Sequence, residues 1–200
     1  MKIAFIIFDG MTSLDFVGFY DPITRLKTMG FLPDLEWEVC GRTAEVRDTS
    51  GLLLKPDRVS GSLRGFDMTF LPGGSGTRTL KDDAPFIEWI RTARPCRYKV
   101  SVCSGALLLG AAGFLEGKTA TTHPGAYDLL QTYTPKVSRE RIVDEGEVIT
   151  GGGVSSSIDL GLYLCEKFAG AEARKKIQKQ MDYPYEAPPP LRPQAAAGTS

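Results

Sequence analysis

The sequence predicts an α/β fold, a layered sandwich in which helices cover both faces of a mostly parallel sheet. Apolar segments of strand length alternate with helical patterns along the chain, which is the order typical of such folds. The first strand segment, residues 2–8, is continuously apolar, as expected of a strand covered on both faces. Several of the strand segments end in glycine or small residues. Ligands of these folds bind at the carboxyl ends of the strands, so we expect the functional site there.

Composition limits the protein to a few classes. The chain has 200 residues and a formal net charge of +0, which predicts one domain over residues 1–182 and a Pro/Ala-rich tail over residues 183–200, extended or loosely attached. The sequence contains no long run of like charges, so we expect neither a nucleic-acid nor a membrane partner. No apolar segment is long enough to cross a bilayer, and no signal peptide is evident, so we expect a cytoplasmic protein.

The cysteines and the histidine give no sign of a metal site or a disulfide framework. Cys40, Cys96, Cys103 and Cys165 lack the C-x-x-C spacing, so reduced thiols are expected. His123 is the single histidine and has no Cys/His cluster around it. The glycines from Gly151 lack a Walker lysine and a dinucleotide fingerprint. We therefore expect no metal and no cofactor.

The first half of the chain predicts two buried strands, one strand of alternating pattern and two helices. Strands are expected at residues 2–8, 35–41 and 66–71, a hairpin within 46–60, and helices after residue 13 and over 81–93. Pro22 lies inside the first helix and should kink or split it. The last of these strands ends in Pro72-Gly-Gly-Ser-Gly76, where glycines permit close approach of the backbone to another group.

The second half is built around residues 99–113, a β-branched strand that runs directly into a helix of small residues. Further strands are expected at residues 119–122, 139–143 and 148–150, and helices at 125–133, 155–168 and 171–181.

Cys103 lies at the joint between strand and helix and is the candidate nucleophile. A side chain at such a turn projects above the sheet edge, towards the free N–H groups at the start of the helix. These groups and the helix dipole favour a thiolate over a thiol. A free cysteine is more commonly a small buried apolar residue, but the position of Cys103 favours the reactive interpretation.

A carboxylate is expected beside the cysteine as a general acid and base. Asp15 follows the first strand by one turn and so should lie on the same edge of the sheet as Cys103. The alternative is a capping box over residues 12–15, in which Asp15 only satisfies helix N–H groups. Asp9 and Asp21 are weaker candidates, because Asp9 resembles a turn former and Asp21 precedes a proline.

Backbone amides of Gly74 and Ser104 are candidates for an oxyanion pocket, and the Ser104 hydroxyl could donate to the carboxylate or to substrate. The alternatives are a simple turn at Gly74 and helix capping by Ser104. His123 could serve as the base of a Cys-His pair, although a lone histidine is more often a packed one. We rank that pair below the pair of Cys103 and Asp15.

Together these motifs resemble the ThiJ/PfpI superfamily, and within it the isocyanide hydratases. The segments that carry the resemblance are Val102–Gly113, Leu71-Pro-Gly-Gly74, Ala120-Thr-Thr-His123, Leu14-Asp15 and Ile149-Thr-Gly-Gly-Gly-Val154. It extends from residue 2 to about residue 190. The resemblance implies a flavodoxin-like three-layer sandwich, a homodimer, a nucleophile-elbow cysteine at Cys103 and a partner carboxylate at Asp15. Ser104 stands where peptidase-like relatives carry His, which argues against proteolysis.

The implied activity is hydration of an isocyanide to an N-substituted formamide through a covalent thioimidate on Cys103, with Ser104 and Gly74 as positioning groups. Two alternatives stay open. One is a glyoxalase-like thiol enzyme acting on small carbonyl compounds. The other is a non-enzymatic redox or ligand sensor, related to the similar domain of AraC-type regulators.

Overall fold

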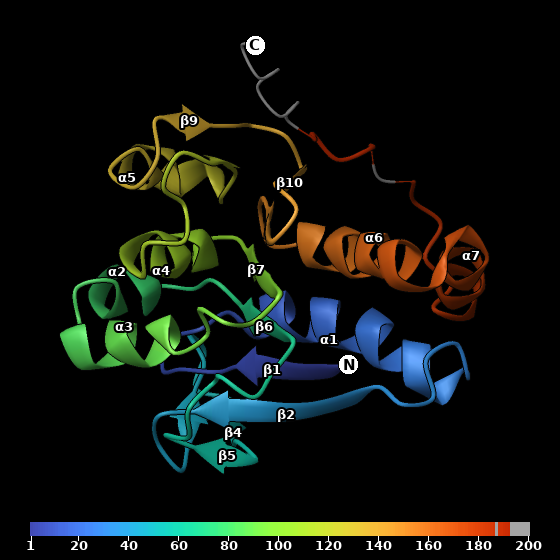
Figure 1. Cartoon of the computed structure of the whole chain (residues 1–200), viewed down its shortest axis with the longest axis horizontal. Coiled ribbons are helices and arrows are strands. Elements are labelled where there is room, and N and C mark those ends of the chain that lie inside the picture. The colour runs from blue at the N-terminus through green and yellow to red at the C-terminus, as the bar shows by residue number, and fades with distance from the viewer. Residues whose placement is uncertain (187, 193–200) are drawn as a thin grey trace.

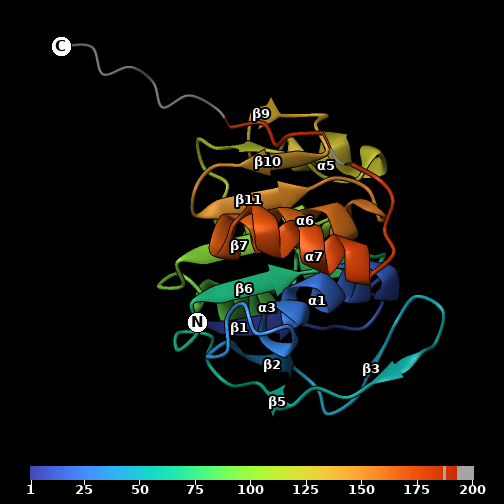
Figure 2. The ribbon, with the colours of Figure 1, turned by 90° about the vertical axis from the view of Figure 1, so that its right-hand side faces the viewer.

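The computed structural model describes residues 1–186 and 188–192 and is organised around a seven-stranded sheet with the order β10-β11-β7-β6-β1-β2-β5 (Figure 2). Its strands are β1 (Lys2–Ile6), β2 (Glu36–Gly41), β5 (Arg58–Val59), β6 (Met68–Leu71), β7 (Tyr98–Val102), β10 (Ile142–Asp144) and β11 (Val148–Gly151). Neighbouring strands are parallel except β10 and β11, which form an antiparallel pair. The mostly parallel sheet predicted from the sequence is confirmed.

Helices cover both faces of this sheet (Figure 1). One layer contains α1 (Ser13–Thr28), α6 (Ser156–Ala169) and α7 (Ala171–Gln180), which pack against one another. The other contains α2 (Thr77–Leu80), α3 (Ala84–Arg91) and α4 (Gly105–Ala111), with α5 (Tyr127–Leu130) beside α4. The three-layer sandwich follows from the sequence because strands buried on both faces need a helical layer on each side.

The core between β1, β6 and α1 is aromatic. Phe19 of α1 stacks on Phe70 of β6 with ring centroids 3.9 Å apart, and Phe5 of β1 meets both rings edge to face. All three side chains are fully buried. Burial of a Phe side chain contributes roughly 1.5–3 kcal/mol, so this cluster firmly fixes the start of α1 over the sheet.

Two helices differ from the expectation. The helix predicted over residues 81–93 is present as α3, which begins where Asp83 accepts the Phe86 N–H at 2.8 Å, whereas the short helix α2 before it was not predicted. The helix containing Pro22 is not split: α1 runs through it as one element. Gly161 of α6 lets the proline ring pack closely, since a Cβ there would lie 2.4 Å from Pro22 Cγ. Packing against α6 therefore holds α1 continuous.

The hairpin expected within residues 46–60 is present as β3 (Val46–Arg47) and β4 (Leu53–Leu54), whereas β5 leaves it and joins the main sheet. The hairpin is fixed to the loop after β1, because Arg47 N–H donates to Asp9 at 2.7 Å. A separate parallel pair consists of β8 (Thr119–Ala120) and β9 (Lys136–Val137), of which β9 was not predicted.

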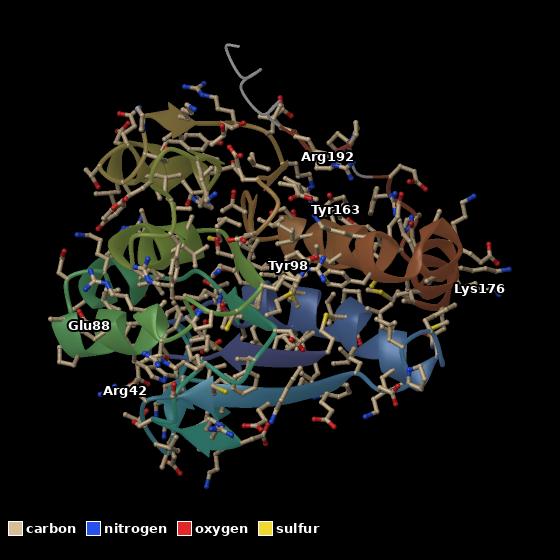
Figure 3. All side chains as sticks on the ribbon, viewed as in Figure 1. Arg42, Glu88, Tyr98, Tyr163, Lys176 and Arg192 are labelled. Carbon is tan, nitrogen blue, oxygen red and sulfur yellow. The ribbon has the colours of Figure 1, made fainter. Side chains whose placement is uncertain are left out.

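The described part of the tail is extended, but it is attached to the domain. Leu191 pairs with Val143 of β10, its N–H donating to Ile142 O at 2.9 Å and its carbonyl accepting from Asp144 N–H at 2.9 Å. Arg192 donates to the hydroxyl of Tyr163 on α6 at 3.1 Å (Figure 3). The expectation for residues 187 and 193–200 lies outside the described residues. Among the helices described, none is sufficiently long and apolar to cross a bilayer.

Candidate active site

The candidate site lies at the carboxyl edge of the sheet, where the strand order reverses. The chain leaves β1 for β2 on one side and returns to β6 on the other, so a crevice opens beyond β1 and β6. Three segments meet there: the start of α1, the glycine turn after β6, and the joint between β7 and α4. These are the segments that carry Asp15, Gly74 and Cys103.

Cys103 occupies a strained backbone position. Its φ is 54°, in the left-handed region that costs a residue with a side chain about 1–2 kcal/mol. Hydrogen bonds on both sides hold it there. Its N–H donates to the carbonyls of Gly151 and Gly152 at 3.1 and 2.7 Å, and its carbonyl accepts the Thr122 hydroxyl at 2.7 Å. The loop after β11 therefore serves to fix the turn that presents the thiol.

Asp15 lies beside this thiol and does not cap its helix. Its side chain is fully buried, and Oδ2 accepts the Gly73 N–H at 2.8 Å. The Gly73 carbonyl in turn accepts the Thr12 N–H at 2.8 Å, so the glycine turn is bound to the start of α1 from both sides. Thr12 makes no side-chain cap. These contacts rule out the capping-box alternative for residues 12–15.

Burial and mutual repulsion determine the charge of this pair. Burial raises the pKa of Asp15 to about 6, although hydrogen bonds from Gly73 N–H and the Cys103 thiol oppose the shift. Burial, followed by the charge of Asp15, raises the pKa of Cys103 to about 12, against the opposing effect of the Ser104 N–H. Two adjacent buried anions are unfavourable. Above pH 6 the pair therefore carries one negative charge and one shared proton.

The helix start is expected to favour a thiolate at Cys103, and burial and the charge of Asp15 act against this by raising the pKa of the thiol. The start of α4 places the N–H and the hydroxyl of Ser104 at the sulfur, where both lower the pKa of the thiol, but desolvation and the neighbouring carboxylate have the larger effect.

Ser104 and Gly74 form a hydrogen-bonded unit behind the thiol. Gly74 N–H donates to Ser104 Oγ at 3.0 Å, and Ser104 Oγ donates to the Gly74 carbonyl at 3.1 Å. Thr77 Oγ1 lies 2.9 Å from Ser104 Oγ. The expectation that the Gly74 amide is an oxyanion donor is not supported, because Ser104 already accepts that N–H. The Ser104 amide is directed at the sulfur, as expected.

A pocket of about 210 Å³ opens over Cys103, and its wall includes side chains of Thr12, Ser75, Arg78, His123 and Val154. His123 thus lies at the site, but its Nδ1 accepts the Gly125 N–H at 3.0 Å and caps the 3₁₀ turn Pro124–Ala126. Because Nδ1 accepts this bond, Nε2 is the ring nitrogen that can donate towards the pocket. His123 is therefore placed to contact a ligand, while Asp15 is the group paired with the thiol.

The other candidates lie elsewhere. Asp9 accepts the Arg47 N–H from the hairpin, and Asp21 forms a surface ion pair with Arg25.

Sequence reasoning missed two residues of the site, Gly73 and Arg78. The paired glycines after β6 were the available signal for Gly73, whereas a lone arginine in a surface-like segment gave none. In the described part of the chain, no group of three His, Cys, Asp or Glu side chains could hold a metal ion.

The need for glycine at position 73 can be tested directly. A Cβ there would lie 2.5 Å from Ser104 N, 2.7 Å from Cys103 Cβ and 2.9 Å from Asp15 Oδ2. Gly73→Ala should therefore lower the free energy of unfolding by about 1–3 kcal/mol, as overpacking does, and separate the acid from the thiol. Urea unfolding measures the first effect. Gly65→Ala, at a site with nothing within 4 Å of an added Cβ, is the control and should change stability by at most about 0.5 kcal/mol. Equal stability of the two variants would contradict the close packing.

Comparison with known proteins agrees with this architecture. Residues 1–167 match the model of the DJ-1/PfpI family. The chain is 36% identical to the isonitrile hydratase of Pseudomonas putida over 185 residues, covering 92% of this chain and 78% of that protein. It is 26% identical to the HTH-type transcriptional regulator CdhR of Pseudomonas aeruginosa, covering 88% of this chain and 53% of the regulator. A solved THiJ/PfpI family protein from Pseudomonas syringae superposes with a TM-score of 0.81 at 29% identity, covering 94% of this chain and 76% of that one. On the match to residues 1–167 and the shared fold, this chain belongs to the DJ-1/PfpI family.

Proposed function

We propose that this protein is a cofactor-independent isocyanide hydratase, which converts an isocyanide and water into an N-substituted formamide. The observation that carries the proposal is the buried pair of Cys103 and Asp15, a nucleophile and a carboxylate that meet at Gly73, where an added Cβ would lie 2.7 Å from Cys103 Cβ and 2.9 Å from Asp15 Oδ2. Hydration of an isocyanide requires both a bond to its terminal carbon and a proton on that carbon. The similarity to an isonitrile hydratase supports the same choice.

In the first half of the reaction, the proton of the Cys103 thiol moves to Asp15 and the sulfur attacks the terminal carbon of the isocyanide. A C–S bond forms, and Asp15 delivers its proton to the same carbon. The product is a neutral thioimidate, R–N=CH–S, on Cys103. Asp15 is left as a carboxylate, so the net charge of the buried site does not change during this half.

In the second half, Asp15 acts as base and takes a proton from water as its oxygen attacks the thioimidate carbon. Asp15 then protonates the nitrogen, and the C–S bond breaks to release R–NH–CHO. The sulfur leaves as a thiolate next to the Ser104 N–H and recovers the remaining proton of the water. The sum is one isocyanide plus one water giving one formamide. General acid–base assistance of this kind contributes on the order of 10²–10⁴ in rate.

The direct test is product formation. Purified protein is incubated with isobutyl isocyanide in ¹⁸O-labelled water, and N-isobutylformamide is quantified by mass spectrometry. We expect labelled formamide at a rate proportional to enzyme concentration, and a Cys103 adduct with the mass of one isocyanide when the reaction is quenched with acid. Formation of no formamide from isobutyl isocyanide, isocyanoacetate or methyl isocyanide would overturn the proposal.

The alternative thiol chemistry uses the same pocket and is separated by a second substrate. Lactate formed from methylglyoxal, together with no formamide from any isocyanide, would assign a glyoxalase-like activity instead. The homodimer and the cytoplasmic location implied by the sequence stay expectations of the proposal, as does its one small-molecule partner.

A further inference from the structure

The pocket over Cys103 has one charged wall residue, and that residue is a cation. Among the described residues that line it, Arg78 carries the only permanently charged side chain. Asp15 is fully buried behind the thiol and is not part of the wall. A ligand that reaches Cys103 therefore passes a positive group, with no carboxylate beside it to neutralise that charge.

Arg78 is held in position while most of its donors stay free. It lies on α2, and its Nη2 donates to the Gly125 carbonyl at 3.2 Å. This bond connects the glycine turn after β6 with the 3₁₀ turn that carries His123, on the opposite wall. Within residues 1–186 and 188–192 no carboxylate is in ion-pair distance of Arg78. A guanidinium presents five N–H donors in a planar fork that suits a carboxylate.

The rest of the wall favours a small polar ligand. Thr12 and Ser75 provide hydroxyl groups, His123 retains an N–H on Nε2, and Val154 is the one apolar side chain apart from the reactive cysteine. The volume of about 210 Å³ is below the range of roughly 300–1,000 Å³ common for drug-sized ligands. A bulky aromatic or aliphatic group would find little apolar surface to cover here.

We propose that the preferred substrates are small anionic isocyanides, isocyano carboxylates in which Arg78 binds the carboxylate while Cys103 attacks the isocyanide carbon. This inference rests on the proposed hydratase function and adds the substrate class and a residue that selects it. Arg78 acts by binding and orientation, and it takes no part in proton transfer.

The test compares two isocyanides of equal branching, isocyanoacetate and isobutyl isocyanide, which differ in the carboxylate. For the wild type, kcat/KM for isocyanoacetate should exceed that for isobutyl isocyanide. Arg78→Met should lower the ratio of the two values about 10-fold, the effect of removing one charge-assisted contact at a partly exposed site. The loss should appear mainly in KM, and Arg78→Lys should lie between the two proteins. Added salt should lower the wild-type ratio, because screening weakens an exposed ion pair.

Arg91→Met is the matched control. Arg91, the last residue of α3, also donates Nη2 to a backbone carbonyl, that of Ala111, at 3.2 Å, but it pairs with Glu88 and is outside the pocket. In Arg91→Met, the ratio of kcat/KM for isocyanoacetate to kcat/KM for isobutyl isocyanide should equal that of the wild type. Equal turnover of both isocyanides by the wild type, or an unchanged ratio in Arg78→Met, would overturn the substrate class and leave the hydratase function standing.

A second measurement does not depend on hydratase activity. Alkylation of Cys103 by iodoacetate and by iodoacetamide is followed by mass spectrometry, and the ratio of the two rates reports anion recognition at the pocket. The ratio should fall about 10-fold in Arg78→Met and stay constant in Arg91→Met. A ratio that does not respond to Arg78 would overturn the inference. If no isocyanide is hydrated but the ratio falls as expected, the hydratase proposal fails while the anion site remains.

Discussion

Cys103→Ala is expected to form formamide at no more than the uncatalysed rate, a loss of at least about 10⁴-fold in kcat. The sulfur is the only atom proposed to bond to the isocyanide carbon, and alanine offers no replacement. The backbone hydrogen bonds of residue 103 to the glycine loop involve no side-chain atom. The fold should therefore persist, and circular dichroism and thermal unfolding would show it.

The matched control for this variant is Cys96→Ala. Cys96 is another buried thiol, which donates to the Leu63 carbonyl at 3.2 Å on the far side of the core from the pocket. Its loss should cost stability through a lost contact and a small cavity but leave kcat within a few-fold of the wild type. Residual formamide production by Cys103→Ala above a no-enzyme sample would contradict a covalent intermediate on this residue.

Asp15→Asn is expected to lose on the order of 10²–10⁴ in kcat/KM and yet to be the more stable protein at neutral pH. Asparagine keeps an oxygen for the Gly73 N–H but cannot exchange a proton with the thiol. Burial raises the pKa of Asp15 from 3.8 to about 6. Folding therefore favours the protonated acid, and the carboxylate present at pH 8 destabilises the wild type. A shift of this size corresponds to about 3 kcal/mol.

The sign of the pH dependence follows from this shift. Below pH 3.8 Asp15 is protonated in both the folded and the unfolded state, so it adds no pH dependence there. As the pH rises from 3.8 to about 6, the unfolded chain releases its proton first, and the wild type loses stability relative to the variant. Urea unfolding from pH 4 to pH 8 should show the difference between the two proteins change by about 2.4 kcal/mol in favour of Asp15→Asn, because part of the shift is already expressed at pH 4.

Asp21→Asn is the control on the same helix. Asp21 is at the surface, where it pairs with Arg25, so its replacement should alter stability by about 0.5 kcal/mol or less and leave formamide production unchanged. A constant stability difference between the wild type and Asp15→Asn across this pH range would show that Asp15 ionises as a solvated carboxylate does.

The parts of the fold that depend on local pattern were predictable. Consecutive apolar residues predict β1 and β6, and small residues directly after an apolar strand predict the strand-to-helix joint at Cys103. The position of Asp15 was predictable for the same reason, because a residue in the first turn of the helix that follows a parallel strand lies at the carboxyl edge of the sheet. By contrast, α2 and the pairing of Leu191 with β10 depend on contacts between distant residues.

The charge of the site could not be predicted from the local sequence alone. The favourable effect of the Ser104 N–H on a thiolate is local, and a strand-to-helix joint reveals it. The unfavourable effect of burial depends on every group packed around Cys103, including a carboxylate 88 positions away in the chain. The requirement for glycine at position 73 also could not be predicted from the local sequence. A Cβ there would collide with Asp15, Cys103 and Ser104, which approach Gly73 only in the folded protein.

The attachment of the tail to β10 also affects how the molecule behaves towards other copies of itself. An open outer strand presents unpaired N–H and carbonyl groups and can recruit foreign strands, which is a common start of aggregation. Leu191 occupies the Ile142 carbonyl and the Asp144 N–H on this strand, and the residues before it are Pro188, Pro189 and Pro190, which have no N–H to offer. The strand that closes this side of the sheet is thus itself a poor template for further growth.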